Sequence, residues 1–290
     1  MTHKPAVAKT IALTVATMIA FAANSLLCRM ALGADAIDAA SFTTLRLASG
    51  ALTLWLILSA TRKDRTRARS DWIAAAMLFL YAIAFSFAYL SLTAGTGALI
   101  LFGAVQLTML TVGLRGGEHF APLSWAGFVL AVVGLVYLVS PGLTAPAPVG
   151  TALMAVAGIA WGVYSLRGRG VANPLIATAG NFARTLPFTL VASVLFISNV
   201  HASWSGALLA VASGAIASGV GYAIWYAALR GLTATRAATV QLSVPVIAAF
   251  GGVALLSERI TLRLLISSIA ILGGIALVLM QRGARAARAP

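Results

Sequence analysis

Long apolar runs alternate with short polar gaps along almost the whole chain. A helix needs about 20 apolar residues to cross the hydrocarbon core of a bilayer, which is roughly 30 Å thick. Ten runs of suitable length are present, at residues 8–29, 40–60, 72–92, 95–113, 122–140, 149–167, 174–198, 205–229, 232–256 and 262–281. The pattern predicts an all-α membrane protein with ten transmembrane helices.

Two apolar stretches are about twice as long as one crossing requires, so each must turn. We place one turn near Gly95 and Gly97 and the other near Arg230 and Gly231. Asp71 precedes the third span, where the positive end of a helix dipole favours a carboxylate. We therefore expect Asp71 to mark the start of that helix.

Composition supports a membrane environment. Of 290 residues, 61% are apolar and 9% are charged, whereas a soluble chain carries about 25% charged residues. The net charge of +14 comes from residues scattered over the gaps between spans. It does not come from one soluble basic face, which nucleic-acid binding would need. We expect a lipid bilayer and a small-molecule substrate as partners, and no nucleic acid.

The basic residues also predict an orientation, because cytoplasmic loops of membrane proteins are rich in Lys and Arg. With ten spans, one set of ends holds Lys4, Lys9, Arg62, Lys63, Arg65, Arg67, Arg69, Arg115, Arg167, Arg169, Arg230, Arg236, Arg282, Arg285 and Arg288. The opposite ends hold Arg29, Arg259 and Arg263. The asymmetry predicts that both termini are cytoplasmic.

The two halves of the chain repeat a few features in the same order. Gly117-Glu118 and Ser257-Glu258 are 140 residues apart, and Gln106 and Gln241 are 135 apart. We therefore expect one five-helix repeat at residues 1–145 and a second at 146–290. Because five is odd, the second repeat enters the membrane inverted, as in many transporters with two alternating conformations.

Short motifs in the second half carry a resemblance. Ala160-Trp161-Gly162, Pro245 and the turn Ser257-Glu258-Arg259-Ile260-Thr261 resemble the EamA-type repeat of the drug/metabolite transporter superfamily. The first half departs from this pattern, with Phe21-Ala22 in place of Trp-Gly and Leu110 or Thr108 in place of the proline.

The run from Phe102 to Gln106 and the aromatic third span resemble the bacterial aromatic amino-acid exporter branch. The resemblance implies a bacterial inner-membrane exporter that works by alternating access. It also implies that the first four helices of each half line a central cavity and that the fifth and tenth helices are peripheral.

No carboxylate or histidine lies mid-membrane. The six Asp and Glu residues fall near span ends, and His3, His119 and His201 fall outside the spans. Proton-driven carriers commonly relay protons through such groups inside the membrane. We therefore expect a facilitator, or an exchanger that does not depend on a titrating side chain at the midplane.

Aromatic and amide side chains within spans are the candidate substrate-binding residues, since such groups suit a flat amphipathic ligand. Tyr81, Phe85 and Tyr89 recur every four residues on one helix face. The full candidate set is Asn24, Tyr81, Phe85, Tyr89, Phe102, Gln106, Trp161, Tyr164, Asn181, Tyr222, Tyr226 and Gln241. Ordinary helix packing is the alternative for each.

Three further residues have two interpretations each. Arg46 and Arg184 lie within the second span of each half, and each either bonds polar groups in its own half or attracts a substrate carboxylate. Pro245 frees a backbone carbonyl and either acts as a gating hinge or makes an ordinary kink. Glu118 and Glu258 are expected to stabilise the starts of the fifth and tenth helices.

We expect a transporter of small metabolites, most specifically an exporter or facilitator of amino acids including aromatic ones. Drugs, nucleotide precursors and sugars are the alternative substrates. A membrane enzyme would need His, Asp, Glu or Lys converging at one depth, and a channel would need a selectivity ring; the sequence marks neither. No catalytic residue, cofactor or metal site is expected, and the lone Cys28 forms no internal disulfide.

Overall fold

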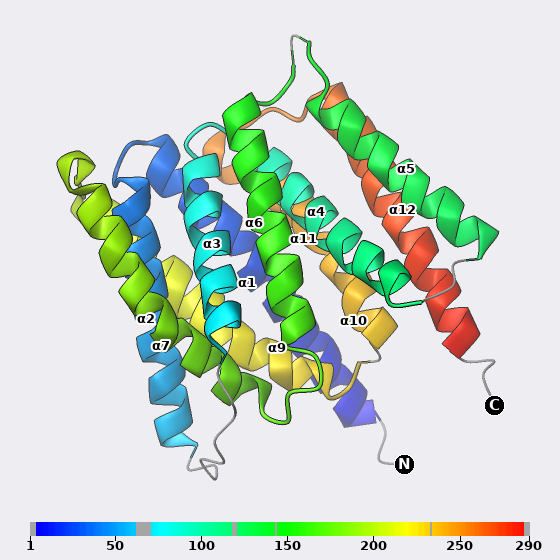
Figure 1. The fold of residues 1–290 in the computed structure, drawn as a ribbon, viewed down its shortest axis with the longest axis horizontal. Coiled ribbons are helices and arrows are strands. Elements are labelled where there is room, and N and C mark those ends of the chain that lie inside the picture. The colour runs from blue at the N-terminus through cyan, green and yellow to red at the C-terminus, as the bar shows by residue number, and fades with distance from the viewer. Residues whose placement is uncertain (1–3, 62–70, 118–120, 143, 233, 287–290) are drawn as a thin grey trace.

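The computed structural model describes residues 4–61, 71–117, 121–142, 144–232 and 234–286. Within these ranges the chain is a bundle of helices (Figure 1), and the only β-type pairing is a single antiparallel bridge between Ile37 and Ala202. The all-α fold predicted from the apolar runs is confirmed.

The first half contains five helices joined by short connections. They are α1 (Lys4–Gly33), α2 (Ala39–Ala60), α3 (Trp72–Ala88), α4 (Ala94–Arg115) and α5 (Pro122–Val139). The long apolar stretch from 72 to 113 turns between α3 and α4, slightly before the predicted glycines. Asp71 caps α3 as expected, and its carboxylate accepts a hydrogen bond from the backbone N–H of Ile73 at 2.9 Å.

The second half also crosses the bundle five times, but two of its helices are interrupted. It comprises α6 (Pro148–Arg167), α7 (Pro174–Leu195), a short 3₁₀ turn η1 (Ile197–Asn199), α8 (Trp204–Ala212), the π-helix η2 (Ser213–Val220), α9 (Gly221–Leu229), α10 (Ala234–Gln241), α11 (Ser243–Leu256) and α12 (Leu262–Ala286). The predicted eighth span corresponds to α8, η2 and α9. The ninth corresponds to α10 and α11.

Eight of the helical segments in the described ranges are long and apolar enough to cross a membrane. The other two predicted spans differ for simple reasons. Helix α3 is apolar but has only 17 residues. Helix α7 has 22 residues but includes Asn181, Arg184 and several threonines, which lower its hydropathy. Both are partly enclosed by other helices, so neither faces lipid on all sides.

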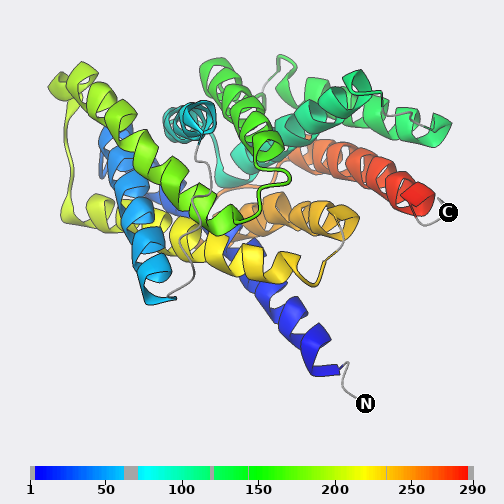
Figure 2. The ribbon, with the colours of Figure 1, turned by 60° about the horizontal axis from the view of Figure 1, so that its bottom comes forward.

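Helices α5 and α12 pack side by side at one edge of the bundle (Figures 1 and 2). Gly127 and Gly274 lie at their closest approach, and a Cβ on Gly127 would come within 2.5 Å of the Gly274 carbonyl oxygen. Only glycine fits at this crossing. The pair lies at the edge of the bundle, as the resemblance implied, although Leu279 of α12 reaches the cavity described below.

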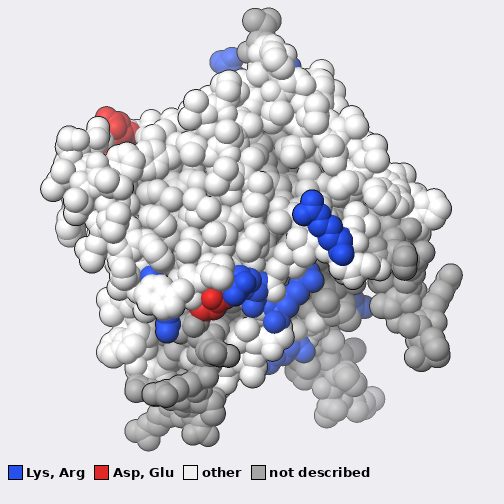
Figure 3. All heavy atoms as spheres, in the orientation of Figure 1, with Lys and Arg blue, Asp and Glu red and all other residues white. Residues whose placement is uncertain are grey.

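The outer surface is largely apolar, as a lipid-facing surface must be. Large side chains such as Leu195, Leu262 and Ile269 are more than two-thirds exposed. On the face in Figure 3, most Lys and Arg side chains gather in the lower part, at the end of the bundle where α1 begins and α12 ends in Figure 1.

Part of the predicted basic set cannot be placed on this surface. Arg62, Lys63, Arg65, Arg67, Arg69 and Arg288 lie outside the described residues, as do Glu118 and His119. The side chains of Lys4, Arg282 and Arg285 are likewise outside what the structure describes. Arg115, Arg167, Arg169 and Arg230 are described, and they lie at or just after the ends of α4, α6 and α9.

Candidate functional site

A cavity of about 670 Å³ lies between the two halves of the chain. Helices α4, α6, α7, α9, α10 and α12 contribute to its wall, together with Phe21 of α1 and the start of α3. The lining reaches Gly168 and Arg169 in the connection after α6. The cavity therefore extends from the interior of the bundle to the end where the described basic residues gather.

Seven of the candidate binding residues line this cavity. They are Gln106, Trp161, Tyr164, Asn181, Tyr222, Tyr226 and Gln241. The two glutamines come from α4 and from the end of α10, which the predicted repeat makes corresponding positions. The structure thus brings residues of both halves to one site, although their roles in binding stay predictions.

The other five candidates lie outside the lining. Asn24 of α1 accepts hydrogen bonds from the hydroxyls of Ser213 (2.8 Å) and Ser218 (3.4 Å), and so ties α1 to η2. Tyr89 is fully buried and donates to the Ala94 carbonyl oxygen at 3.3 Å. Both side chains contact other parts of the protein rather than the open space.

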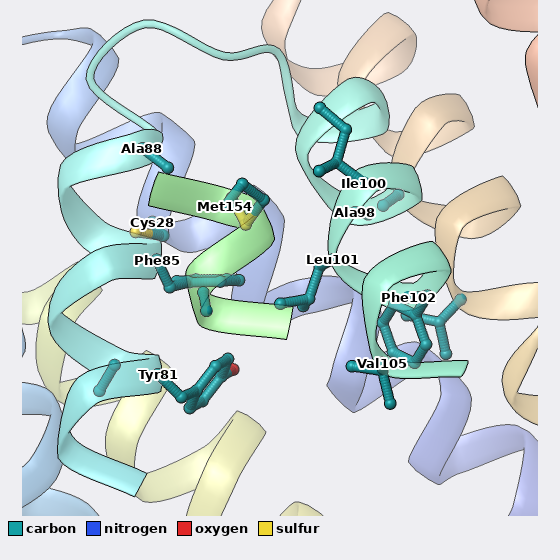
Figure 4. Close-up of a cluster of buried hydrophobic side chains, with 14 of the residues drawn as sticks. Cys28, Tyr81, Phe85, Ala88, Ala98, Ile100, Leu101, Phe102, Val105 and Met154 are labelled. Atoms are coloured by element: carbon teal, nitrogen blue, oxygen red, sulfur yellow. The ribbon is translucent and has the colours of Figure 1, made fainter. Parts of the chain in front are cut away.

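Tyr81, Phe85 and Phe102 are also buried in the core. Figure 4 shows Tyr81 and Phe85 projecting from one side of α3, towards the helix that carries Leu101 and Phe102. The ring centroids of Tyr81 and Phe85 are 5.4 Å apart. These rings form a layer immediately behind the cavity wall, because Tyr81 also contacts Trp161 at a centroid distance of 4.8 Å.

Trp161 lies at the centre of the aromatic wall. Its ring centroid is 5.2 Å from that of Tyr164 and 5.7 Å from that of Tyr222. The ring centroid of Phe21 is 5.8 Å from that of Tyr222. Tilted ring pairs at these distances are favourable aromatic contacts, and all four rings line the cavity.

A chain of three hydroxyls joins α6, α7 and α9 at the cavity surface. The Tyr164 hydroxyl donates to Thr178 Oγ1 at 3.4 Å, and Thr178 Oγ1 lies 2.7 Å from the Tyr226 hydroxyl. Thr178 was not among the candidate residues predicted from the sequence. Its signal was its position three residues before Asn181, which places both side chains on one face of α7.

The mouth of the cavity is charged. Arg167 at the end of α6 forms an ion pair and a hydrogen bond with the Asp71 carboxylate, and the backbone N–H of Asp71 donates to Asn181 Oδ1 at 3.2 Å. Slight burial raises the pKa of the Asp71 carboxyl, but the bonds from Arg167 and from the Ile73 N–H outweigh it. The pKa therefore lies below its ordinary value. Asp71 is thus charged and paired at neutral pH.

Arg46 and Arg184 differ although the predicted repeat places them at corresponding positions. Arg46 is buried, donates from Nη2 to the Tyr81 hydroxyl at 2.8 Å, and lies 4.8 Å from the centroid of the Phe85 ring. Arg184 is half-buried, donates to the Gly180 carbonyl oxygen at 3.3 Å, and lies 5.4 Å from the Trp72 ring. Neither lines the cavity.

The opposite end of the bundle is closed by contacts around Glu258. Its two carboxylate oxygens lie 3.0 and 2.9 Å from the backbone nitrogen of Ala94, the first residue of α4. Glu258 therefore stabilises the start of α4 in the other half, whereas the sequence suggested the tenth crossing. The start of α12 is capped by Thr261, whose Oγ1 accepts from the Leu264 N–H at 3.1 Å.

Pro245 lies four residues after Gln241, where α10 ends. A proline has no N–H, so it leaves the carbonyl four residues earlier without its helical partner. The interruption between α10 and α11 thus has a local cause, and it falls beside Gln241 in the cavity wall. Whether the interruption moves during transport stays a prediction.

The chain resembles known proteins in sequence and fold. Residues 148–280 match the EamA-like transporter family. Over 280 residues the chain is 53% identical to the uncharacterized protein PA1977 of Pseudomonas aeruginosa, covering 97% of this chain and 98% of that protein. A solved crystal structure shares 22% identity and the fold, with a TM-score of 0.64 over 92% of this chain and 96% of that one.

Proposed function

We propose that this chain, which belongs to one family with protein PA1977 and whose residues 148–280 match the EamA-like transporter family, exports small organic molecules by alternating access. The cavity between the halves is the substrate site. The observation that carries the proposal is the asymmetry of the bundle, in which the cavity reaches one end while contacts between the two halves close the other.

The cavity wall favours a flat, amphipathic substrate. The rings of Phe21, Trp161 and Tyr222 offer apolar surface, while the amides of Gln106 and Asn181 offer both hydrogen-bond donors and acceptors. A site of this kind suits a ring with a polar group attached. We therefore propose amino acids as substrates, the aromatic ones first, with other metabolites of similar shape as the alternative.

The charges at the mouth support an orientation. Arg167 and Arg169 lie where the cavity reaches the end of the bundle, and basic residues accumulate on the cytoplasmic side of inner-membrane proteins. In this orientation both termini are cytoplasmic and the structure is open to the cytoplasm. Such a conformation takes up substrate from inside the cell, as an exporter requires.

The wall also supports transport without a proton relay. Among the residues that line the cavity, the one carboxylate is Asp71, and it is paired with Arg167 at the mouth. The remaining polar lining consists of amides, hydroxyls and two arginines at the mouth. We propose a facilitator or exchanger in which the substrate gradient drives flux.

A cavity-filling variant tests this assignment. Ala238 of α10 lines the cavity and has a small side chain, so Ala238→Trp should occupy the space and reduce tryptophan flux in proteoliposomes about 10-fold or more. Val194→Trp is the matched control, because Val194 is 68% exposed on the outer surface of α7. Equal flux in both variants would show that the substrate uses another route.

A further inference from the structure

We propose that Arg46 binds the anionic group of the substrate, a carboxylate, once the cavity closes around it. The inference rests on the proposed function. It concerns the substrate carboxylate, for which the cavity wall offers no charged partner inside the membrane. The wall offers rings, amides and hydroxyls, but no positive charge at membrane depth. The positive charge lies one layer behind it.

Arg46 is a buried cation without an anion. Its side chain is 2% exposed, and the ion pairs among the described residues involve Arg29, Arg167 and His201 instead. A charged group at this depth is costly unless it is paired or hydrated. A charge that is kept here without a protein counter-ion points to a counter-ion that arrives from outside.

The hydrogen bonds of the guanidinium are incomplete in the same way. Nη2 donates to the Tyr81 hydroxyl, whereas Nη1 is buried and has no hydrogen-bond partner among the described residues. The rings of Tyr81 and Phe85 stabilise the charge through their faces but accept no ordinary hydrogen bond. A carboxylate would complete these hydrogen bonds, because the planar guanidinium fork binds its two oxygens side by side.

Arg46 is close to the cavity. Tyr81, its hydrogen-bond partner, lies 4.8 Å from Trp161 between ring centroids, and Trp161 forms part of the wall. One aromatic layer therefore separates the guanidinium from the open space. A substrate that displaces the Tyr81 hydroxyl from Arg46 would place its ring among Trp161 and Tyr222 and its carboxylate on the guanidinium.

The helix beside Arg46 is also irregular. Residues Ser213–Val220 form the π-helix η2, and Gly214 leaves room there for the backbone carbonyl of Arg46. Wide helical turns of this type occur frequently at functional sites. Helix α9, which follows η2 directly, carries Tyr222 in the cavity wall. A change in η2 would thus move the cavity wall and the surroundings of Arg46 together.

The corresponding residue in the second half provides a matched control. Arg184 is half-buried, bonds a carbonyl of its own helix and lies over Trp72 near the start of α3. That environment fits a structural role at the helix surface. Arg46→Gln and Arg184→Gln remove the same charge from corresponding helices, but only the first removes it from behind the cavity wall.

The test compares ligands that differ only at the carboxylate. Proteoliposomes are assayed for uptake of labelled tryptophan, with unlabelled tryptophan or tryptophanamide as competitor. Charge-assisted hydrogen bonds predict that the wild-type protein binds tryptophan about 10- to 100-fold more tightly than the amide. Arg46→Gln should reduce this preference to about 3-fold or less, Arg46→Lys should retain part of it, and Arg184→Gln should keep it.

A second measurement, of ligand binding alone, applies if a variant does not fold or if tryptophan is not transported. The purified wild-type protein is heated with each ligand, since a ligand that binds the folded state raises its unfolding temperature. Stabilisation by tryptophan but not by the amide supports the inference even if Arg46→Gln is lost. Equal competition and equal stabilisation by the two ligands would overturn the role of Arg46 while leaving transport intact.

The remaining outcomes separate the two proposals. Stabilisation by tryptophan without any tryptophan flux would overturn the proposed function but not carboxylate binding by Arg46. The absence of both flux and stabilisation with either ligand would overturn both. Retention of the full carboxylate preference in a folded Arg46→Gln protein would assign the carboxylate to another residue.

Discussion

Arg29 and Glu258 form an ion pair across the two halves of the chain, with Arg29 Nε 3.4 Å from Glu258 Oε1. Arg29 also donates from Nη1 to the Tyr89 carbonyl oxygen at 3.0 Å, and Glu258 accepts from the Ala94 N–H. The pair therefore holds the ends of α1 and α3 and the start of α4 against the turn between α11 and α12. In an alternating-access cycle these contacts must separate when the other side opens.

Weakening this pair should open the closed end. Glu258→Gln keeps an acceptor for the Ala94 N–H but removes the charge that pairs with Arg29, at a cost of about 1–2 kcal/mol. A change of this size shifts the equilibrium between the closed and open states of this end about 10-fold. Cys28, the only cysteine, lies beside Arg29 and is fully buried, so its labelling by a membrane-impermeant maleimide reports the opening. We expect labelling to become about 10-fold faster.

Arg167→Gln is the control for this measurement, because it breaks an ion pair at the open end. It should leave the labelling rate of Cys28 unchanged. If Glu258→Gln labels at the wild-type rate, the Arg29–Glu258 contact does not keep this end closed.

Trp161 should determine the preference for aromatic substrates. Trp161→Ala removes the central ring of the wall, and aromatic contacts contribute about 0.5–1.5 kcal/mol beyond the area they bury. We expect about a 10-fold loss of tryptophan flux and a smaller loss for leucine, while Trp161→Phe keeps most of the flux. The control is Trp55→Ala, since Trp55 is exposed on the outer surface. Equal losses of tryptophan and leucine flux would contradict a ring-binding role.

Thr178 should stabilise the protein more than either tyrosine hydroxyl that it contacts. Thr178→Val leaves the hydroxyls of Tyr164 and Tyr226 without this partner, at about 1–3 kcal/mol for each hydroxyl that stays unpaired. Tyr226→Phe removes one bond and leaves Tyr164 bonded, so we expect about 1 kcal/mol. Thermal unfolding in detergent measures both variants. A smaller effect of Thr178→Val would show that water or another group replaces the threonine.

Pro245 should make the cavity wall movable. Pro245→Ala restores an N–H that can bond the Gln241 carbonyl and so join α10 to α11. We expect a higher unfolding temperature and slower tryptophan flux, with binding of tryptophan retained. Pro187→Ala is the control, because α7 continues through Pro187 without interruption. Unchanged flux in Pro245→Ala would assign this interruption to packing alone.

His201 should make one contact on the closed side dependent on pH. Its ring lies 3.1 Å from the Asn199 carbonyl and 3.1 Å from the Asp35 carboxylate. The bond to Asn199 raises the pKa of His201 most, slight desolvation opposes it, and the charge of Asp35 raises it further. A raised pKa in the folded state stabilises the protein below the ordinary pKa of histidine, and this stabilisation is lost as pH rises through the folded-state value.

The unfolding temperature of the wild-type protein should therefore show a small decrease between pH 5.5 and pH 8 that His201→Gln lacks. The effect is small because the side chain is half exposed. An identical pH dependence in the two proteins would show that the His201–Asp35 contact adds nothing to stability.

The helices could be predicted from the sequence because each crossing needs its own apolar run, and the interruptions could be placed only roughly. Pro245 marked the break after Gln241, but nothing in Ser213–Val220 distinguishes a π-helix from an α-helix. The position of η2 depends on contacts such as Gly214 against α2, which a single run of residues does not contain.

The candidate site was predictable where both halves contribute similar residues, as with Gln106 and Gln241. It was not predictable where tertiary contacts give residues of the same type different surroundings. Tyr81 and Tyr164 are both tyrosines within spans, yet one bonds Arg46 behind the wall and the other bonds Thr178 on its surface. Glu258 likewise has its partner in the first half, whereas helix-terminus rules alone predict that it stabilises the start of α12 in its own half.

Counterflow of tryptophan tests the central claim most directly. Proteoliposomes that contain the purified protein are loaded with unlabelled tryptophan and diluted into a trace of labelled tryptophan, without any ion gradient. If the protein is an alternating-access carrier, labelled tryptophan should accumulate transiently inside above its outside concentration. Each unlabelled tryptophan that moves out leaves the binding site facing the outside, where it can bind a labelled molecule and carry it in. Label that only equilibrates, or does not enter for any member of an amino-acid panel, would contradict the account.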